Sequence, residues 1–434
     1  MAVGSKIILL MLFKKLILIV IILATCCRGI CEQSEIPVGK ASEEGMDEAK
    51  LLALAQWIDK EQRLAIYSLL ISKNGKLVFE LYTGQIKPDQ SHYLMSVTKS
   101  VLSLLIGIFL DEDKKWTEDS SVAEMLPERV FRNNNNKPRF EPISLKMVLG
   151  MSALLVDDPP RNMRSEAIEH QGKYLSARNR LEFVLQEPLL PEPGVNLLYN
   201  DETPTIASGI LSYNTKLSAF DYGCKTLFKE LEMKNMEWMH QDLVGINPGG
   251  YGLRLRPIDM QKIGLLILNN GKWNNKQVIS EAWIQKIQSP YMGNNGIKEC
   301  VNDYGWYWWF YDYLKVSSNP EESKRYPFML AQGWKGQRIA VIPEEKLVVT
   351  MTGCIEKDKY DEFSVFDKIL KLYILPAAKC YEGSNTLFDQ FPLDQNLGEV
   401  LKKINMGQNR YSKDMEGRMI PSVSPKEKAV RFRP

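Results

Sequence analysis

The sequence predicts an α+β protein in which one antiparallel sheet is built from both ends of the chain and flanked by helices. Two observations predict this fold. Strand-like segments occur in pairs at residues 66–84 and 337–353, and the chain between about 115 and 260 is rich in helix and loop signals. We therefore expect a mostly helical insertion between two parts of one sheet. A chain of 434 residues, 44% of them hydrophobic, can bury a sizeable core.

The elements follow in order along the chain. Residues 46–62 have apolar side chains at helical spacing, and residues 66–84 contain Asn74-Gly75, a strong signal for a two-residue hairpin turn. A long apolar run beginning near Ser96 predicts a buried helix that ends at about Leu110. Residues 256–271 predict a further helix ended by Asn and Gly, and residues 362–378 predict a last helix that closes the fold.

The two ends of the chain differ from the rest. Residues 1–31 contain "LILIVIILATCC", an apolar stretch that is short for a membrane span and suits a secretory signal peptide, with an uncleaved anchor as the alternative. We expect an exported protein, secreted or periplasmic, which would contact a membrane only through this segment. Residues 32–44 are interpreted as a linker, residues 45–400 as the domain, and residues 401–434 as a partly disordered basic extension.

Charge and cysteine spacing exclude several classes of function. The formal net charge is +2, and the basic residues of the C-terminal extension are scattered among prolines, so nucleic acid is not an expected partner. The cysteines beyond the leader are far apart and have no CxxC spacing, so we expect no metal site and no cofactor. The sequence does not predict an oligomeric state or a disulfide pairing.

A possible catalytic pair opens the apolar helix. Ser96-Val-Thr-Lys99 is the only Ser-x-x-Lys in the chain, and residues three apart share a helix face, so the lysine amine can reach the serine hydroxyl. The alternative is that Ser96 caps the helix and Lys99 is solvated. No Gly-x-Ser-x-Gly elbow is present and the chain has three histidines, so the base would be lysine, tyrosine or both.

A second polar cluster follows a Pro-Gly turn in "PEPGVNLLYNDETPTIASGIL", where Tyr199 precedes an apolar helix. Together with "YLMSVTKSVLSLLIG", "GGYGLRLRPIDMQKIGLLILNNGKWNNKQVIS" and "GWKGQRIAVIPEEKLVVTMTG", this segment resembles the serine β-lactamase and penicillin-binding protein superfamily. The likeness covers roughly residues 40–400 and is closest to the class C-type branch, which includes esterases and 6-aminohexanoate-dimer hydrolases.

The resemblance implies a fold like that of β-lactamases and transpeptidases, and it implies roles for individual residues. Ser96 would be acylated by an ester or amide, and Lys99 and Tyr199 would share the role of base. The backbone N–H groups of Ser96 and Trp334 would form the oxyanion hole.

The sequence departs from the family pattern at two places. The Tyr-x-Asn motif reads Tyr199-Asn200-Asp201, and a carboxylate near Lys99 would favour the charged ammonium, so we expect Tyr199 to abstract the proton. The alternative is that Asp201 points elsewhere and Asn200 takes its place.

The second departure is the missing Lys-Thr-Gly motif, whose place falls on residues 331–333. Gln332 and Gly333 stand there, and Lys335 is a possible substitute for the missing cation. β-Lactam hydrolysis is therefore disfavoured. The aromatic run "DYGWYWWFYDY" is interpreted as sheet packing or as an apolar wall for substrate.

These features predict a serine hydrolase of small esters or amides. A β-lactamase or D-alanyl peptidase is the alternative enzyme, and a non-catalytic binding or scaffold protein on the same fold is the alternative of another class.

Overall fold

The computed structural model describes residues 35–61, 64–84, 86–131, 136–156, 165–293, 303–314, 325–355 and 362–378. The chain divides into two units, residues 1–38 and 39–434, and the elements below belong to the second. The predicted leader (1–31) and the C-terminal extension (401–434) lie outside the described residues. Among the helices of the described part, none is long and apolar enough to cross a membrane.

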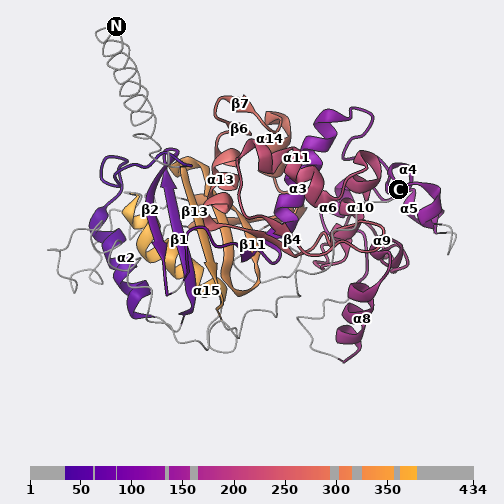
Figure 1. Cartoon of the computed structure of the whole chain (residues 1–434), viewed down its shortest axis with the longest axis horizontal. Helices are drawn as coiled ribbons and strands as arrows, with labels where there is room; N and C mark the ends of the chain where they lie inside the picture. The colour runs from indigo at the N-terminus through magenta and orange to yellow at the C-terminus, as the bar shows by residue number, and fades with distance from the viewer. Residues whose placement is uncertain are drawn as a thin grey trace, which may run out of the picture. The chain divides into compact units, whose positions relative to one another are not determined.

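One eight-stranded antiparallel sheet forms the centre of this unit, in the order β2-β1-β13-β12-β11-β10-β9-β8 (Figure 1). Its strands are β1 (Ile66–Lys73), β2 (Lys76–Tyr82), β8 (Met292–Gly293), β9 (Asp303–Gly305), β10 (Trp308–Leu314), β11 (Arg325–Gly333), β12 (Gln337–Ile342) and β13 (Leu347–Gly353). β1 pairs with β13, with Ile71 opposite Val349, so the early strand pair and the late strand pair of the chain join in one sheet, beside its β2 edge. The predicted α+β class and its sheet are thus confirmed.

The β1–β2 hairpin turns at the two residues that the sequence indicates. Asn74 and Gly75 have φ angles of 53° and 81°, which place both in the left-handed region. A two-residue turn with both central residues at positive φ matches the right-handed twist of the paired strands, and Asn-Gly is the dipeptide that adopts it at least cost.

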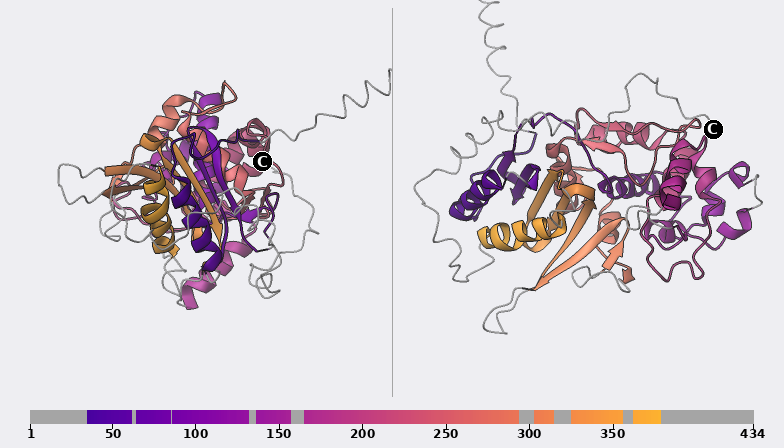
Figure 2. Two further views of the ribbon diagram at one scale, coloured as in Figure 1. Left: turned by 90° about the vertical axis from the view of Figure 1, so that its left-hand side faces the viewer. Right: turned by 90° about the horizontal axis from the view of Figure 1, so that it is seen from below.

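Helices cover the sheet on both faces, as the right-hand view of Figure 2 shows. On one side, α2 (Glu48–Lys60) packs beside the C-terminal helix, which comprises α15 (Glu362–Ile369), the π-helical turn η6 (Leu370–Ile374) and α16 (Leu375–Ala377). On the other side, α13 (Pro257–Leu268) lies against β1, β12 and β13. Gly264 of α13 allows this close packing, because a Cβ there would lie 2.3 Å from Val348.

The segment between β2 and β8 is mainly helical. Its helices are α3 (Val97–Glu112), α4 (Val122–Met125), η2 (Glu128–Phe131), α5 (Lys137–Phe140), α6 (Leu145–Leu149), α8 (Ser165–Ser176), α9 (Arg180–Val184), α10 (Thr203–Thr215), α11 (Ala219–Lys225), α12 (Leu227–Glu230), α13 and α14 (Glu281–Ile287). Two small sheets interrupt them: β3 (His92–Tyr93), β5 (Leu253–Leu255) and β4 (Glu237–Trp238) form one, and β6 (Lys272–Trp273) and β7 (Lys276–Gln277) form the other.

Helix α3 joins these two parts of the fold. It contacts β11 and β12 of the large sheet on one side and α10 and α11 of the helical segment on the other. Its side chains from Val97 to Leu110 are buried, which explains why the helix is mostly apolar after its first two turns. The residue at its N-terminal end, Ser96, therefore lies where the sheet and the helical segment meet.

Candidate active site

Ser96 precedes the first turn of α3 and makes no capping hydrogen bond with its side chain. Its hydroxyl instead accepts a hydrogen bond from Lys99 Nζ at 2.9 Å. Met95, directly before it, has a φ of 49°, a conformation that costs free energy for a residue with a side chain and that is often found at functional sites. The alternative in which Ser96 is an ordinary helix cap does not hold.

Lys99 is buried, with an exposed fraction of 1%. Besides Ser96, its ammonium donates to the Asp201 carboxylate and to the backbone carbonyl of Gly250, the latter at 2.8 Å. Three acceptors match the three N–H donors of a charged lysine, whereas a neutral amine has only two. The alternative in which Lys99 is solvated is therefore wrong.

The charged state of Lys99 follows from a balance of effects on its pKa. Burial lowers the pKa of the amine, but the Asp201 carboxylate, together with the Tyr199 hydroxyl, outweighs burial and raises the pKa above its ordinary value. Lys99 Nζ also lies 4.8 Å from the centroid of the Tyr199 ring. Lysine is thus an ammonium at neutral pH, next to both the serine and the tyrosine.

Tyr199 is held by the aromatic run of β9 and β10. Its ring centroid lies 6.0 Å from that of Tyr304 and 5.3 Å from that of Trp309. Both of these residues are buried. From the sequence, the aromatic run is interpreted either as sheet packing or as a wall for substrate, and residues 304–311 are all buried, as sheet packing requires. Part of this packing also positions Tyr199.

Asn200 and Asp201 point to different partners. The Asn200 side chain accepts from the backbone N–H groups of Glu202 and Thr203, at 3.1 and 2.7 Å, and donates to Leu198. It is buried and caps the first turn of α10. Asp201 therefore occupies the place next to Lys99, and the alternative in which Asn200 takes that place is wrong.

The end of β11 approaches the residues that lead into Ser96. A Cβ on Gly333 would lie 2.3 Å from the Leu94 carbonyl oxygen and 3.2 Å from Met95 Cβ, so only glycine allows the two backbones to come this close. The turn that starts at Trp334 thus begins beside the start of α3. The Trp334 side chain is 50% exposed.

Gln332 and Lys335 occupy the region where the family motif is missing. Gln332 is half-buried, and its side-chain oxygen accepts from the Tyr311 hydroxyl at 3.0 Å. Lys335 lies in the turn between β11 and β12 with a φ of 64°, and its Nζ is 4.8 Å from the Trp334 ring centroid. Neither side chain is paired with Ser96, Lys99 or Asp201 within the described residues.

Sequence reasoning missed two features beside this site. One is the Gly250 carbonyl that binds Lys99; the only signal was the Gly249-Gly250 pair, and a Cβ on Gly250 would lie 2.3 Å from the Asp201 carbonyl oxygen. The other is a group of three side chains, His170, Glu187 and Glu202, whose ligand atoms lie within 4.8 Å of one another. The expectation of no metal site is based on cysteine spacing, and these three residues are dispersed along the chain and form no motif.

The other two histidines, His92 and His240, are not paired with Ser96 in the described part of the chain. His92 is buried on β3, where burial lowers its pKa to about 4, and His240 is exposed. Within the described residues, no histidine forms a hydrogen bond with Ser96.

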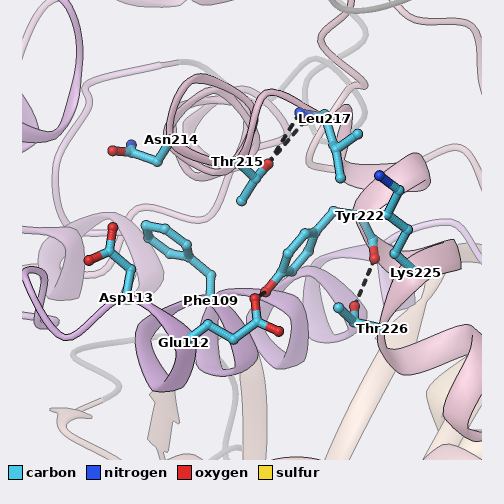
Figure 3. Close-up of a pocket in the computed structure, with 9 residues that line it drawn as sticks. All are labelled: Phe109, Glu112, Asp113, Asn214, Thr215, Leu217, Tyr222, Lys225 and Thr226. Atoms are coloured by element: carbon cyan, nitrogen blue, oxygen red, sulfur yellow. Dashed lines mark hydrogen bonds between the residues drawn. The ribbon is translucent and has the colours of Figure 1, made fainter.

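A hollow of about 440 Å³ lies at the other end of α3 (Figure 3). Its lining includes Phe109, Glu112 and Tyr222, and the Tyr222 hydroxyl donates to Glu112 at 2.7 Å. Phe109 follows Ser96 by thirteen residues, about 20 Å along a helix. This hollow is therefore separate from the Ser96 site, which is identified by its hydrogen bonds and not by a cavity.

Comparisons with known proteins agree with this arrangement. The chain is 20% identical over 257 residues to the 6-aminohexanoate-dimer hydrolase of Paenarthrobacter ureafaciens, which covers 57% of this chain and 62% of that protein. The fold of this chain resembles that of the octameric penicillin-binding protein homologue from Pyrococcus abyssi. The TM-score is 0.55 at 17% identity, and the match covers 76% of this chain and 78% of the other.

A structure from Bacteroides dorei, whose proposed identity is a β-lactamase, gives a TM-score of 0.59 at 16% identity, over 77% of this chain and 99% of that one. At these identities the structural likeness shows the fold alone. A match of residues 51–357 to the β-lactamase family model, described next, and the hydrolase relative together support a serine hydrolase in general.

The family itself is shown by a match along the sequence. The β-lactamase family model matches residues 51–357, which is more than half of the chain and includes both the Ser96 helix and the β11–β13 strands. The chain therefore belongs to the β-lactamase family.

Proposed function

We propose that this protein hydrolyses small esters or amides through an acyl-enzyme formed on Ser96. The observation that carries the proposal is the hydrogen bond from the buried Lys99 ammonium to the Ser96 hydroxyl, beside Tyr199. A serine is a weak nucleophile until a neighbouring group takes its proton. A buried cation next to that hydroxyl favours the ionised serine oxygen.

Proton transfer is assigned to Tyr199. Lys99 already carries its full set of protons and donates to three acceptors, so it has no lone pair with which to accept another. In this step Tyr199 acts as the phenolate, whose negative charge the nearby Lys99 ammonium stabilises, and it becomes the neutral phenol when it takes the serine proton. As the Ser96 oxygen bonds to the carbonyl carbon, Tyr199 passes the proton to the leaving alcohol or amine.

The oxyanion of the tetrahedral intermediate would be bound by the backbone N–H groups of Ser96 and Trp334. Support comes from the close approach of Gly333 to Leu94, which puts the start of the Trp334 turn next to the start of α3. Water then attacks the acyl-enzyme, Tyr199 takes a proton from that water, and the Ser96 oxygen is released and protonated again. The cycle uses side chains of this chain only.

Two features favour simple esters and amides over β-lactams. The position of the family's lysine and threonine carries Ala331 and Gln332, and Gln332 already binds Tyr311. Neither of these two side chains carries a positive charge for a substrate carboxylate. The nearby Trp334 side chain is half-exposed and offers an apolar surface for an acyl or alkyl group.

The test is covalent labelling with a fluorophosphonate probe, followed by mass spectrometry of the labelled peptide. We expect one label, on Ser96, and none in Ser96→Ala. Ser289→Ala, which changes an exposed serine, is the matched control and should label like the wild type. A wild-type protein that takes no label, or takes it elsewhere, would favour the non-catalytic scaffold and reject the proposal.

A further inference from the structure

Three side chains from separate elements meet next to the N-terminus of α10. His170 lies on α8, Glu187 follows α9, and Glu202 is the residue directly before α10. The His170 Nε2 atom is 3.0 Å from a Glu202 oxygen and 3.7 Å from a Glu187 oxygen. All three ligand atoms lie within 4.8 Å of one another.

These separations are close to those of a metal centre. A transition-metal ion bound to nitrogen and oxygen at about 2.0–2.2 Å holds neighbouring ligand atoms about 3.0–3.4 Å apart. The two distances to His170 lie close to this range, and side-chain rotations would bring the three ligand atoms, which lie within 4.8 Å of one another, around one ion. The His170 ring is oriented by Phe183, with ring centroids 5.3 Å apart.

The charge of the cluster also favours a cation. The Glu202 side chain is 5% exposed and that of Glu187 is 16% exposed, yet no lysine or arginine of the described residues pairs with either. The two carboxyl groups share one imidazole, so the cluster has more acidic than basic groups. A buried excess of negative charge is costly unless a cation neutralises it.

We propose that His170, Glu187 and Glu202 bind one divalent transition-metal ion, with Zn²⁺ as the best match. One imidazole and two carboxylates suit Zn²⁺ better than Mg²⁺, which prefers oxygen ligands and retains several waters. The His170 side chain is 30% exposed, so water can complete the coordination on that side. The ion is structural: it ties α8 and the loop after α9 to the start of α10.

The proposed ion site lies next to the segment that carries two residues of the Ser96 site. Glu202 directly follows Asp201, and the same short segment carries Tyr199. A bound ion would fix the backbone that presents these two residues to Lys99. The site does not depend on the proposed hydrolase reaction, and its test needs no substrate.

The experiment is isothermal titration of the untagged, EDTA-treated full chain with ZnCl₂ and, separately, with MgCl₂. We expect one Zn²⁺ per chain, much weaker binding of Mg²⁺, and a rise of the melting temperature with Zn²⁺, because a ligand that binds only the folded state stabilises it. Co²⁺ in place of Zn²⁺ should give visible absorption bands from an imidazole–carboxylate site.

The variants separate this site from non-specific binding. His170→Gln changes a partly exposed side chain, should fold, and should weaken Zn²⁺ binding at least about tenfold. His240→Gln removes an exposed histidine and should bind Zn²⁺ like the wild type. Glu187→Gln supplies a second test that leaves the buried Glu202 intact.

Two results would overturn the proposal. One is a wild-type chain that binds no Zn²⁺, which would make the cluster a set of polar contacts between one imidazole and two carboxyl groups. The other is equal Zn²⁺ binding by wild type and His170→Gln, which would locate any bound ion elsewhere.

Discussion

The Lys99 ammonium and the Asp201 carboxylate form an ion pair in which the lysine is 1% exposed and the aspartate 26% exposed. The buried partner is the one that contacts Ser96 and Tyr199, while the aspartate is partly exposed. An ion pair of this kind keeps the lysine protonated, because a neutral lysine would leave the Asp201 carboxylate without a counter-charge. The charge on Asp201 therefore helps to keep protonated the lysine that contacts Ser96.

The first prediction concerns this ion pair. Asp201→Asn removes a negative charge that raises the pKa of Lys99, so the pKa of the lysine should fall. The Lys99–Tyr199 pair beside Ser96 would then lose a proton at lower pH. We expect ester hydrolysis to be retained or increased, with the rising limb of its pH–rate profile moved to lower pH. The measurement is kcat/KM for a chromogenic ester across the pH range. An unchanged profile would make Asp201 a bystander.

The second prediction concerns the proton carrier. Tyr199→Phe keeps the ring packing against Tyr304 and Trp309 but removes the hydroxyl, so kcat should fall by about 10²–10⁴-fold. Tyr304→Phe is the matched control, because the Tyr304 hydroxyl is buried and has no hydrogen-bond partner among the described residues. That variant should keep near-normal turnover. Near-normal turnover in Tyr199→Phe would return the role of base to Lys99.

A third prediction follows from the close approach of β11 to α3. Gly333→Ala would put a methyl group 2.3 Å from the Leu94 carbonyl oxygen, so one backbone must move. We expect lower kcat, because the Trp334 N–H shifts away from Ser96, and a loss of stability of about 1–3 kcal/mol from overpacking. Gly172→Ala, in α8 with nothing within 4 Å of its new methyl group, is the control and should be at least as stable as the wild type. Enzyme assays and chemical denaturation measure the two effects, and full activity in Gly333→Ala would reject this oxyanion hole.

The fourth prediction tests the cap of α10. Asn200→Ala removes the acceptor for two backbone N–H groups, so the free energy of unfolding should fall by about 0.5–2 kcal/mol. Because Asn200 lies between Tyr199 and Asp201, we also expect a lower kcat. Asn179→Ala removes a similar cap from α9, at the Glu182 N–H, without touching the Tyr199 segment, and should lower stability alone. Equal kcat in the two variants would show that the cap does not position the site.

Local patterns in the sequence were enough to predict several elements. Asn74-Gly75 determines its turn, because few dipeptides adopt two consecutive positive φ angles at low cost. The apolar run after Ser96 predicts a buried helix, and helix geometry alone brings Ser96 and Lys99 to one face, whatever the rest of the fold does. The position of the strand pairs at the two ends also predicts that one sheet includes both, although not the order of its strands.

Other features depend on contacts between distant segments. The sequence offers both Asn200 and Asp201 as neighbours of Lys99, and the start of α10 decides between them by using the Asn200 side chain as a cap. The Gly250 carbonyl joins Lys99 only because the segment before β5 folds back against Asp201. No periodicity in the sequence encodes such an approach.

The sequence by itself determined the serine–lysine pair, the Asn74-Gly75 hairpin and the buried helix after Ser96, since each depends on residues a few positions apart. The tertiary structure decided the charge of Lys99, the choice of Asp201 over Asn200 and the meeting of His170 with Glu187 and Glu202. These outcomes depend on burial and on distances between side chains from different elements. Both quantities are fixed only when the helical segment packs against the sheet.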